Sequence, residues 1–364
     1  MKPPVKVAHV YTFGFHPPWT HGESVTSKNI ISALARIYEK VHVFSSVDFE
    51  RTNSPSTCIA ETNVCAHLSS ECRLPKCSDS VDHHIINYPY VPIIRSTGPS
   101  DLLLKRHRRF FYSMMPYNCG YKFLDYARSL LGAAFAISTS RLLTTSRVFY
   151  EISAWTSKVT YLPAPIDPDF FSASFQKVKR LDNQILYVGN LNPIRFPMKE
   201  MMDVFRTITN EGARVKIITS CSLENRTYAE LIRSYCARSG LKRHVDISVR
   251  NLSVSQKIHA YRSSSAFIFP SIFPSTMDSP VTVVEAMASG CVVISTNLHS
   301  LPYILGNGRG ILVRKKKLSS ELKQAISRIL QDSSFAKTIR EKAMDYARRY
   351  HTVESATETI QRLC

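Results

Sequence analysis

Short apolar segments alternate with helical segments along most of the chain, and this alternation restricts the possible folds more than any other feature. The pattern is clearest between residues 184 and 296, where runs of Val, Ile, Leu and Phe separate stretches of helical periodicity. Strands that alternate with helices form parallel sheets, because each helix returns the chain to the edge where the previous strand began. The sequence therefore predicts an α/β fold of doubly wound sheets.

The length of 364 residues allows two such domains. We place one Rossmann-like domain at residues 1–166 and a second at residues 183–350. The last predicted helix, Val353–Leu363, follows no strand, so we expect it to return to the first domain, which residues 351–364 then complete.

Individual elements follow from periodicity and from Gly and Pro positions. In the first domain we assign no element over residues 47–82. The predicted strands there are Val5–Thr12, Val41–Ser45, Ile85–Tyr88, Ala134–Ser138 and Val159–Leu162. The predicted helices are Ser24–Tyr38, Asp101–Met115, Tyr121–Leu131 and Arg141–Glu151. The second domain is predicted to include strand Gln184–Val188, helix Met198–Asn210, strand Ala266–Phe269, helix Pro280–Ser289 and strand Cys291–Thr296.

Positive charge dominates the composition. The chain has 47 Lys and Arg against 28 Asp and Glu, a formal net charge of +19, which favours phosphate-bearing partners such as nucleic acid, anionic membrane or phosphorylated substrates. The 44% of hydrophobic residues excludes a chain that is disordered throughout. No run reaches the roughly 18 apolar residues of a membrane-spanning helix, and prolines interrupt Met1–Phe15 where a signal peptide is apolar. We therefore expect a cytoplasmic protein.

Four of the nine cysteines gather in one segment, at Cys58, Cys65, Cys72 and Cys77. The chain has no CxxC pair, so this is not the spacing of a zinc ribbon or of a secreted disulfide framework. We interpret the segment as a surface excursion. A metal clip or local disulfides are the alternative.

The most informative stretch is FIFPSIFPSTMDSPVTVVEAMASGCVVIST, residues 267–296. It predicts a buried strand, a loop, and a helix that Ser279 caps, with Pro280 at its first position and Gly290 at its end. The start of such a helix favours phosphate. Glu285 lies in the second turn, where its carboxylate could accept hydrogen bonds from sugar hydroxyls. An exposed helix glutamate is the alternative.

This stretch resembles the group 1 family of retaining glycosyltransferases, which have the GT-B fold. Pro270 and Ser271 match its PS, and Glu285 begins its EAMA. The resemblance implies two domains facing across a cleft, with the C-terminal domain binding a nucleotide sugar and the N-terminal domain on the acceptor side. It also implies that Glu285 binds the donor ribose. The family's first Glu falls on Met277, so Asp278 would supply that carboxylate. The implied donor contacts at the start of the helix are Ser279, Val281 and Thr282.

A second match, ILYVGNLNPIRFPMKE, opens the same domain. The family has a strand, Gly and Arg here and then Lys, and the two cations bind the donor diphosphate. In this chain Gly189 is kept, Asn190 replaces the Arg, and Arg195 occupies the Lys position. Lys199 lies one turn into the next helix. A fork of guanidinium donors suits a diphosphate. A merely solvated Lys199 is the alternative.

The N-terminal half matches the family more loosely. HVYTFGFHPPWTHGES resembles its first strand and glycine-rich loop, with Gly22 where the backbone comes close to donor or acceptor. VTYLPAPIDPDFF resembles its interdomain stretch, with Asp167 and Phe170 in the last places. The matches together span roughly residues 5 to 350.

The resemblance implies a retaining hexosyltransferase that moves sugar from a nucleotide-sugar donor to an acceptor hydroxyl. The family uses no bound metal, so no metal or cofactor is expected. Arg195, Lys199 and the helix start would meet the charge on the departing diphosphate. No pair of glutamates is expected to act as in a glycosidase.

The segment LLLKRHRRFFYSMMPY, residues 102–117, is both basic and aromatic. As a helix it would suit an anionic membrane surface and hence a lipid-linked acceptor, so the enzyme could be peripheral to the membrane. An ordinary solvated helix is the alternative. Two other functions stay open. One is a protein that binds or glycosylates nucleic acid, although the sequence has no recognised nucleic-acid motif. The other is a GT-B epimerase or phosphorylase.

Overall fold

The computed structural model describes residues 7–13, 22–46, 64–69, 83–88, 108–113, 141–153, 155–172, 178–273 and 279–363. The chain divides into two compact units. The first includes residues 1–165 and 352–364, and the second consists of residues 166–275 and 279–351.

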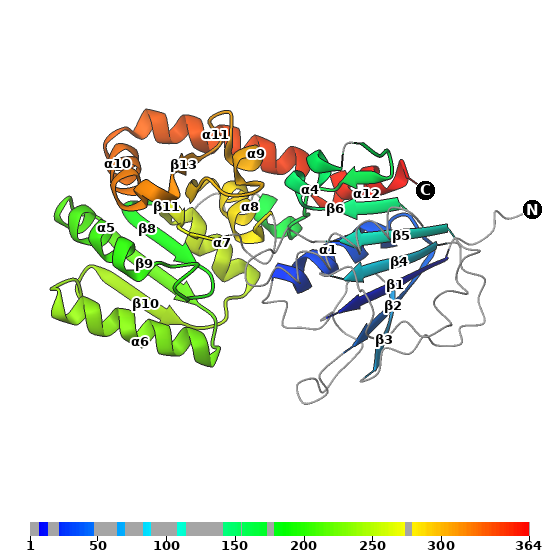
Figure 1. The fold of residues 1–364 in the computed structure, drawn as a ribbon, viewed down its shortest axis with the longest axis horizontal. Coiled ribbons are helices and arrows are strands. Elements are labelled where there is room, and N and C mark those ends of the chain that lie inside the picture. Colours follow the sequence, from blue (N-terminus) through cyan, green and yellow to red (C-terminus); the bar gives the residue numbers. More distant parts are fainter. Residues whose placement is uncertain are drawn as a thin grey trace, which may run out of the picture. The chain divides into compact units, whose positions relative to one another are not determined.

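The first unit contains a seven-stranded sheet in the order β3-β2-β1-β4-β5-β6-β7 (Figure 1). All of the neighbouring strands are parallel. The strands are β1 (Val7–Phe13), β2 (Lys40–Ser46), β3 (Val64–Ser69), β4 (His83–Tyr88), β5 (Arg108–Ser113), β6 (Arg141–Thr144) and β7 (Val159–Tyr161). Helices α1 (Gly22–Ala35), α4 (Arg147–Ile152) and α12 (Val353–Gln361) belong to the same unit.

Two sequence predictions in this unit are wrong, and one strand was not predicted. The helix predicted over Asp101–Met115 is a strand at Arg108–Ser113, which pairs with β4 on one side and β6 on the other. Its sequence, RRFFYS, is rich in aromatic residues, which fit a pleated sheet, and the tertiary pairing overrides the helical pattern. The helix predicted from Arg141 begins at Arg147, because residues 141–144 form β6. Strand β3 lies where we assigned no element. Residues 101–107 and 121–138 lie outside the described residues.

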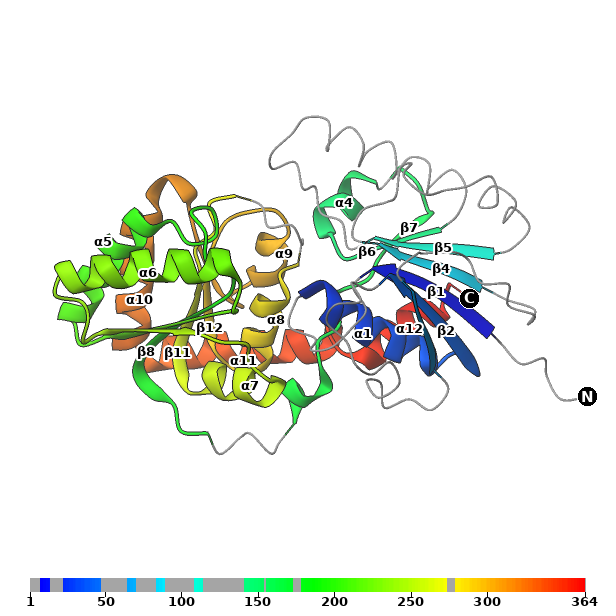
Figure 2. The same ribbon diagram turned by 90° about the horizontal axis from the view of Figure 1, so that it is seen from below.

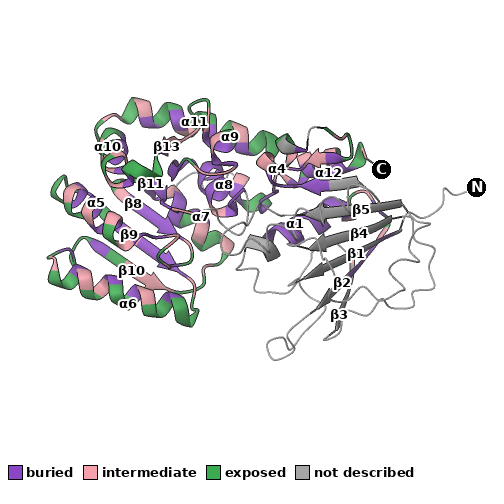
Figure 3. Cartoon of the chain, viewed as in Figure 1, coloured by how far each residue is buried: buried purple, intermediate pink, exposed green. Residues whose placement is uncertain are grey.

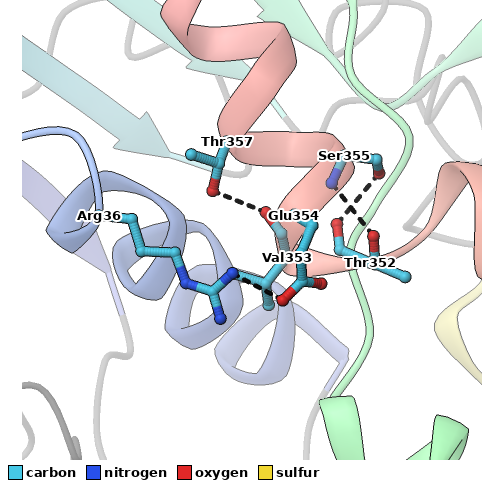
Figure 4. Close-up of polar contacts among 6 residues, drawn as sticks. All are labelled: Arg36, Thr352, Val353, Glu354, Ser355 and Thr357. Atoms are coloured by element: carbon cyan, nitrogen blue, oxygen red, sulfur yellow. Dashed lines mark hydrogen bonds and ion pairs between the residues drawn. The ribbon is translucent and has the colours of Figure 1, made fainter.

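The C-terminal helix α12 packs against α1 of the first unit, as its lack of a preceding strand predicted. Val353, Ala356 and Ile360 are buried in the core that α1 and the first sheet share. Figure 4 shows the polar side of this contact, where Arg36 Nη1 donates to Glu354 Oε1 at 2.6 Å. Thr352 caps the helix by accepting a hydrogen bond from the backbone N–H of Ser355. Apolar burial and a proper N-cap together fix this return of the chain.

The second unit has a six-stranded parallel sheet in the order β10-β9-β8-β11-β12-β13. Figure 2 shows helices on both of its faces. The strands are β8 (Leu181–Val188), β9 (Arg214–Thr219), β10 (Val245–Val249), β11 (Ser264–Phe269), β12 (Val292–Thr296) and β13 (Ile311–Val313). The helical elements are η3 (Pro168–Phe171), α5 (Met198–Asn210), α6 (Leu223–Arg238), α7 (Val254–Arg262), α8 (Val281–Ala288), α9 (Leu301–Leu305), η5 (Lys315–Lys317), α10 (Leu318–Gln331) and α11 (Ser333–Tyr350).

The core of the second unit explains its nearly continuous apolar strands. β11 and β12 are buried along their whole length. Most of α8 is also buried (Figure 3). Strands covered by helices on both faces have no solvated side, which accounts for runs such as CVVIST. These observations confirm the predicted α/β class with two Rossmann-like units. Among the described residues, no helix is both long and apolar enough to cross a membrane.

Candidate functional site in the second unit

Strands β8 and β11 lie side by side in the middle of the second sheet, and the strand order reverses between them. The chain proceeds from β8 towards β10 on one side and from β11 towards β13 on the other. In doubly wound sheets, ligands bind at the carboxyl ends of the strands at this switch point. The candidate ligand-binding loops are therefore the loop after Val188 and the loop after Phe269.

These two loops are joined directly. The backbone N–H of Ile272, in the loop after β11, donates to the carbonyl of Ile194, in the loop after β8, at 2.8 Å. Thr296, at the end of β12, donates its hydroxyl to the carbonyl of Ser271 at 2.6 Å. The two stretches that carry the family resemblance are thus neighbours at one edge of one sheet.

The turn after β8 is closed around Gly189. Its N–H donates to Ile218 O at 3.1 Å, and the hydroxyl of Tyr187 donates to Asn190 O at 2.6 Å. A Cβ atom on Gly189 would lie 3.2 Å from that Tyr187 hydroxyl, which is closer than ordinary packing. The turn therefore favours glycine because of a close approach.

Arg195 is held in the same loop. Its backbone N–H donates to Asn192 Oδ1 at 2.9 Å, and the N–H of Ile194 donates to the same oxygen at 3.1 Å. Burial raises the pKa of Tyr187, and the nearby Arg195 guanidinium acts in the opposite direction. The charge of Arg195 therefore acts electrostatically on Tyr187, two residues before Gly189. Lys199 is exposed in the first turn of α5.

Asn190, which stands where the family has Arg, belongs to a polar cluster that sequence reasoning missed. Its Oδ1 accepts from Ser220 Oγ at 3.2 Å and from Asn225 Nδ2 at 3.3 Å. Asn225 is buried, and its Oδ1 accepts from the N–H of Leu191 at 2.7 Å. This asparagine in the first turn of α6 thus fixes the loop after β8. The spacing of Ser222 and Asn225, which is that of an N-cap and its third helical residue, was the available signal.

Helix α8 begins one residue later than predicted. Val281 is its first residue and Pro280 is its N-cap, with the Pro280 carbonyl accepting from Val283 N at 3.0 Å. The prediction that Ser279 caps this helix is wrong. Ser279 is buried with φ +65°, in the left-handed region, whereas N-cap residues adopt extended backbone. The first-turn N–H groups, which include those of Val281 and Thr282, have no acceptor within the helix.

Glu285 is buried, so the alternative of an exposed helix glutamate is wrong. Its side chain is 1% exposed. Lys257 Nζ lies 3.2 Å from Glu285 Oε1, and the Tyr261 hydroxyl donates to Oε2 at 3.3 Å. Burial, and then the charge of Glu285, raise the pKa of Tyr261 well above its ordinary value. Sequence reasoning missed both partners, although their i, i+4 spacing on α7 places them on one face.

A further cation reaches the loop after β11 from the end of β13. Lys315 Nζ lies 5.8 Å from the centroid of the Phe273 ring. Lys315 begins the Lys315–Lys317 run of η5, all three residues of which are exposed. The run of three lysines is the sequence signal for this cation.

The other predicted site residues lie elsewhere. Asp278 is outside the described residues. Gly22 is the first residue of α1, in the first unit. Asp167 caps η3, where its Oδ1 accepts from Asp169 N, and Phe170 is buried. Cys58, Cys72 and Cys77 lie outside the described residues, and Cys65 is on β3. In the part of the chain that the structure describes, no group of three or more His, Cys, Asp or Glu side chains could hold a metal ion.

Comparison with known structures identifies the fold. A glycosyltransferase from Rickettsia africae superposes with a TM-score of 0.70 at 14% identity, covering 99% of this chain and 98% of that one. Sucrose-phosphate synthase from Thermosynechococcus elongatus gives 0.74 at 14% identity, covering 98% of each chain. The chain has the GT-B fold. Anabaena HepE in complex with UDP and glucose also shares this fold, with a TM-score of 0.67 at 12% identity, covering 98% of each chain.

The family comparison falls on the unit that holds the candidate site. Residues 182–332 match the model of the family described as glycosyl transferases group 1. This range includes the Gly189 turn, α7 and α8 of the GT-B fold. Comparison by sequence alone finds no match among curated proteins.

Proposed function

We propose that this GT-B chain is a retaining glycosyltransferase that moves a hexosyl group from a nucleotide sugar to a hydroxyl of a glycan or lipid-linked acceptor. The observation that carries the proposal is the hydrogen bond between Ile272 and Ile194, which joins the two resembling loops at the switch point. The group 1 match over residues 182–332 supports it. So does the likeness to HepE, which was crystallised with UDP-glucose.

The proposed chemistry is direct displacement on one face. The acceptor oxygen attacks the anomeric carbon on the face from which the diphosphate departs. The bond between that carbon and the phosphate oxygen breaks, and the departing phosphate takes the acceptor's proton. The diphosphate gains charge in this step, so the protein's task is to stabilise that charge.

Each site residue has a role in this proposal. Arg195 and Lys199 attract the diphosphate, and the N–H groups at the start of α8 donate to it without a metal. Glu285 accepts from the donor ribose with lone pairs that Lys257 and Tyr261 leave free, because a carboxylate accepts up to about four hydrogen bonds. Asp278 supplies the carboxylate that the family has at the Met277 position.

The test begins with a thermal-shift screen of the full chain against UDP-, GDP- and ADP-sugars, because a ligand that binds the native state raises its stability. Turnover with the stabilising donor is then measured for Arg195→Ala. We expect a loss of about tenfold or more, from lost stabilisation of the leaving group. Arg214→Ala is the matched control, since Arg214 is exposed at the start of β9, on the opposite edge of the sheet.

Two results would decide against the proposal. Equal turnover in the two variants would remove Arg195 from the site. A chain that no nucleotide sugar stabilises and that transfers no sugar would not be a glycosyltransferase. Sugar that is epimerised, or released to phosphate without reaching an acceptor hydroxyl, would favour the epimerase or phosphorylase alternative.

A further inference from the structure

A group of arginines lies at the amino edge of the second sheet, opposite the edge that bears the candidate donor site. Arg180 precedes β8, and Arg262 ends α7 just before β11. Arg180 Nη2 donates to Gly290 O at 2.7 Å, and its Nε donates to Arg262 O at 3.3 Å. Arg262 Nη2 lies 3.4 Å from Ser172 O. These bonds fix two guanidinium groups at the point where α8 ends.

Helix α11 brings two more arginines to the same place. A Cβ atom on Gly290 would lie 2.8 Å from the sulfur of Met344 and 3.7 Å from Arg180 Nη2, so α11 lies against this turn. Arg340 and Arg348 are four residues before and after Met344. They share its face of the helix and are about 12 Å apart along the axis. We call Arg180, Arg262, Arg340 and Arg348 the arginine quartet.

Negative charge does not balance the quartet. No carboxylate of a described residue forms an ion pair with any of the four. The buried Nε–H of Arg262 has no acceptor among the described residues. Burial lowers the pKa of Arg262, and Arg180 and Arg348 lower it further. Burial and then Arg180 lower the pKa of Arg340, and Cys291, Asp182 and Glu341 act in the opposite direction. Repulsion among four cations gathered in this way lowers the stability of the ligand-free folded protein.

We propose that the arginine quartet is a second anion site, which binds a ligand carrying two or more phosphate groups. Guanidinium groups form paired hydrogen bonds with phosphate oxygens, and two anchored arginines with two on a helix present several such forks at once. Arg340 and Arg348 leave the helix about 12 Å apart along its axis, so they can bind separate phosphates of a phosphate chain or of a multiply phosphorylated headgroup. The site is separate from the diphosphate-binding residues proposed above, because it lies at the other edge of the sheet.

A purely structural role accounts for only half of the quartet. Arg180 and Arg262 bind backbone carbonyls and so hold the ends of α8 and η3 in place. Arg340 and Arg348 donate to no described residue, so no such role explains them. The variant that tests the site is therefore Arg340→Gln with Arg348→Gln. Its control is Lys342→Gln with Arg349→Gln, which removes the same charge from exposed positions of the same helix.

The experiment titrates inorganic tripolyphosphate into the full chain by calorimetry. Both double variants are made in an Arg195→Ala, Lys199→Ala background, so that the proposed donor site contributes little. We expect the quartet variant to bind at least about tenfold more weakly than the control, because it loses charge-assisted hydrogen bonds. We also expect the ligand-free quartet variant to melt at the same or a higher temperature at low salt, because like charges have been removed.

A flotation assay identifies the source of the phosphates. Vesicles of phosphatidylcholine with a phosphorylated phosphoinositide are mixed with the same two variants. If the control floats with the vesicles and the quartet variant does not, the ligand is a lipid headgroup. If tripolyphosphate binds and neither variant floats, the ligand is soluble. Equal tripolyphosphate affinity in the two variants, or a quartet variant that only melts earlier, would overturn the proposal.

Discussion

The middle of α8 and the turn that follows it lie in opposite electrostatic surroundings. In the second turn of the helix, Glu285 is buried and receives one hydrogen bond from Lys257 and one from Tyr261, so its charge is balanced within the core. Just beyond the helix, Gly290 O accepts from Arg180, whose neighbours are other arginines. A balanced pair fixes a side chain in place. An unbalanced cluster keeps an attraction for an anion that the protein itself does not supply.

Breaking the balanced pair should have the largest effect. Lys257→Met leaves the Glu285 carboxylate buried without its cation, which should lower the free energy of unfolding by about 3 kcal/mol. Lys337→Met is the control, because its partner Glu341 is exposed and such pairs contribute less than about 1 kcal/mol. Urea unfolding of the full chain measures both. Equal losses would show that Glu285 does not depend on Lys257.

A smaller effect is expected at the Gly189 turn after β8. Gly189→Ala pushes against the Tyr187 hydroxyl and should weaken its bond to Asn190 O, costing about 1 kcal/mol. The KM for the nucleotide sugar should then rise several-fold. Gly212→Ala costs a similar amount through strain at φ +87°, but it faces open space away from the turn. If the KM for the nucleotide sugar is unchanged in Gly189→Ala, the turn takes no part in binding the donor.

The last effect is absent at neutral pH and appears only at high pH, in the turn that follows α8. Burial raises the pKa of Cys291 from 9.0 to about 12, although Arg180 and Arg340 oppose the shift. The folded protein thus keeps a neutral thiol that the unfolded chain ionises, so stability is lost as pH rises from about 9 towards 12. Cys291→Ala should lose less stability between pH 8 and 11 than the natural chain. Identical slopes in urea unfolding would mean that Cys291 does not contribute.

Sequence reasoning worked best where the signal is local. Helix Met198–Asn210 was predicted to the residue, and β8 and β12 were predicted within three residues. Periodicity, capping residues and a following glycine encode such elements within a few turns of chain. The Gly189 and Glu285 motifs were found for the same reason. Their placement together could be argued only from topology.

The wrong predictions share a different cause. A helix was predicted where β5 lies, because the segment's aromatic and basic residues fit both the helical and the strand repeat. Only the pairing with β4 and β6 selects the strand. Ser279 was expected to cap α8 on residue type alone, while its actual backbone is left-handed. The partners of Glu285 were missed because they come from another helix.

The sequence by itself determined the class of this protein: alternating strands and helices, a glycine turn after one strand and a glycine stop after α8. These are short-range preferences of the backbone and of side-chain patterns. Only the tertiary structure decided that α12 packs against α1, that Glu285 is buried against Lys257, and that arginines from three separate segments gather near the turn after α8. Those outcomes depend on burial and charge between residues far apart in the chain, which no local pattern records.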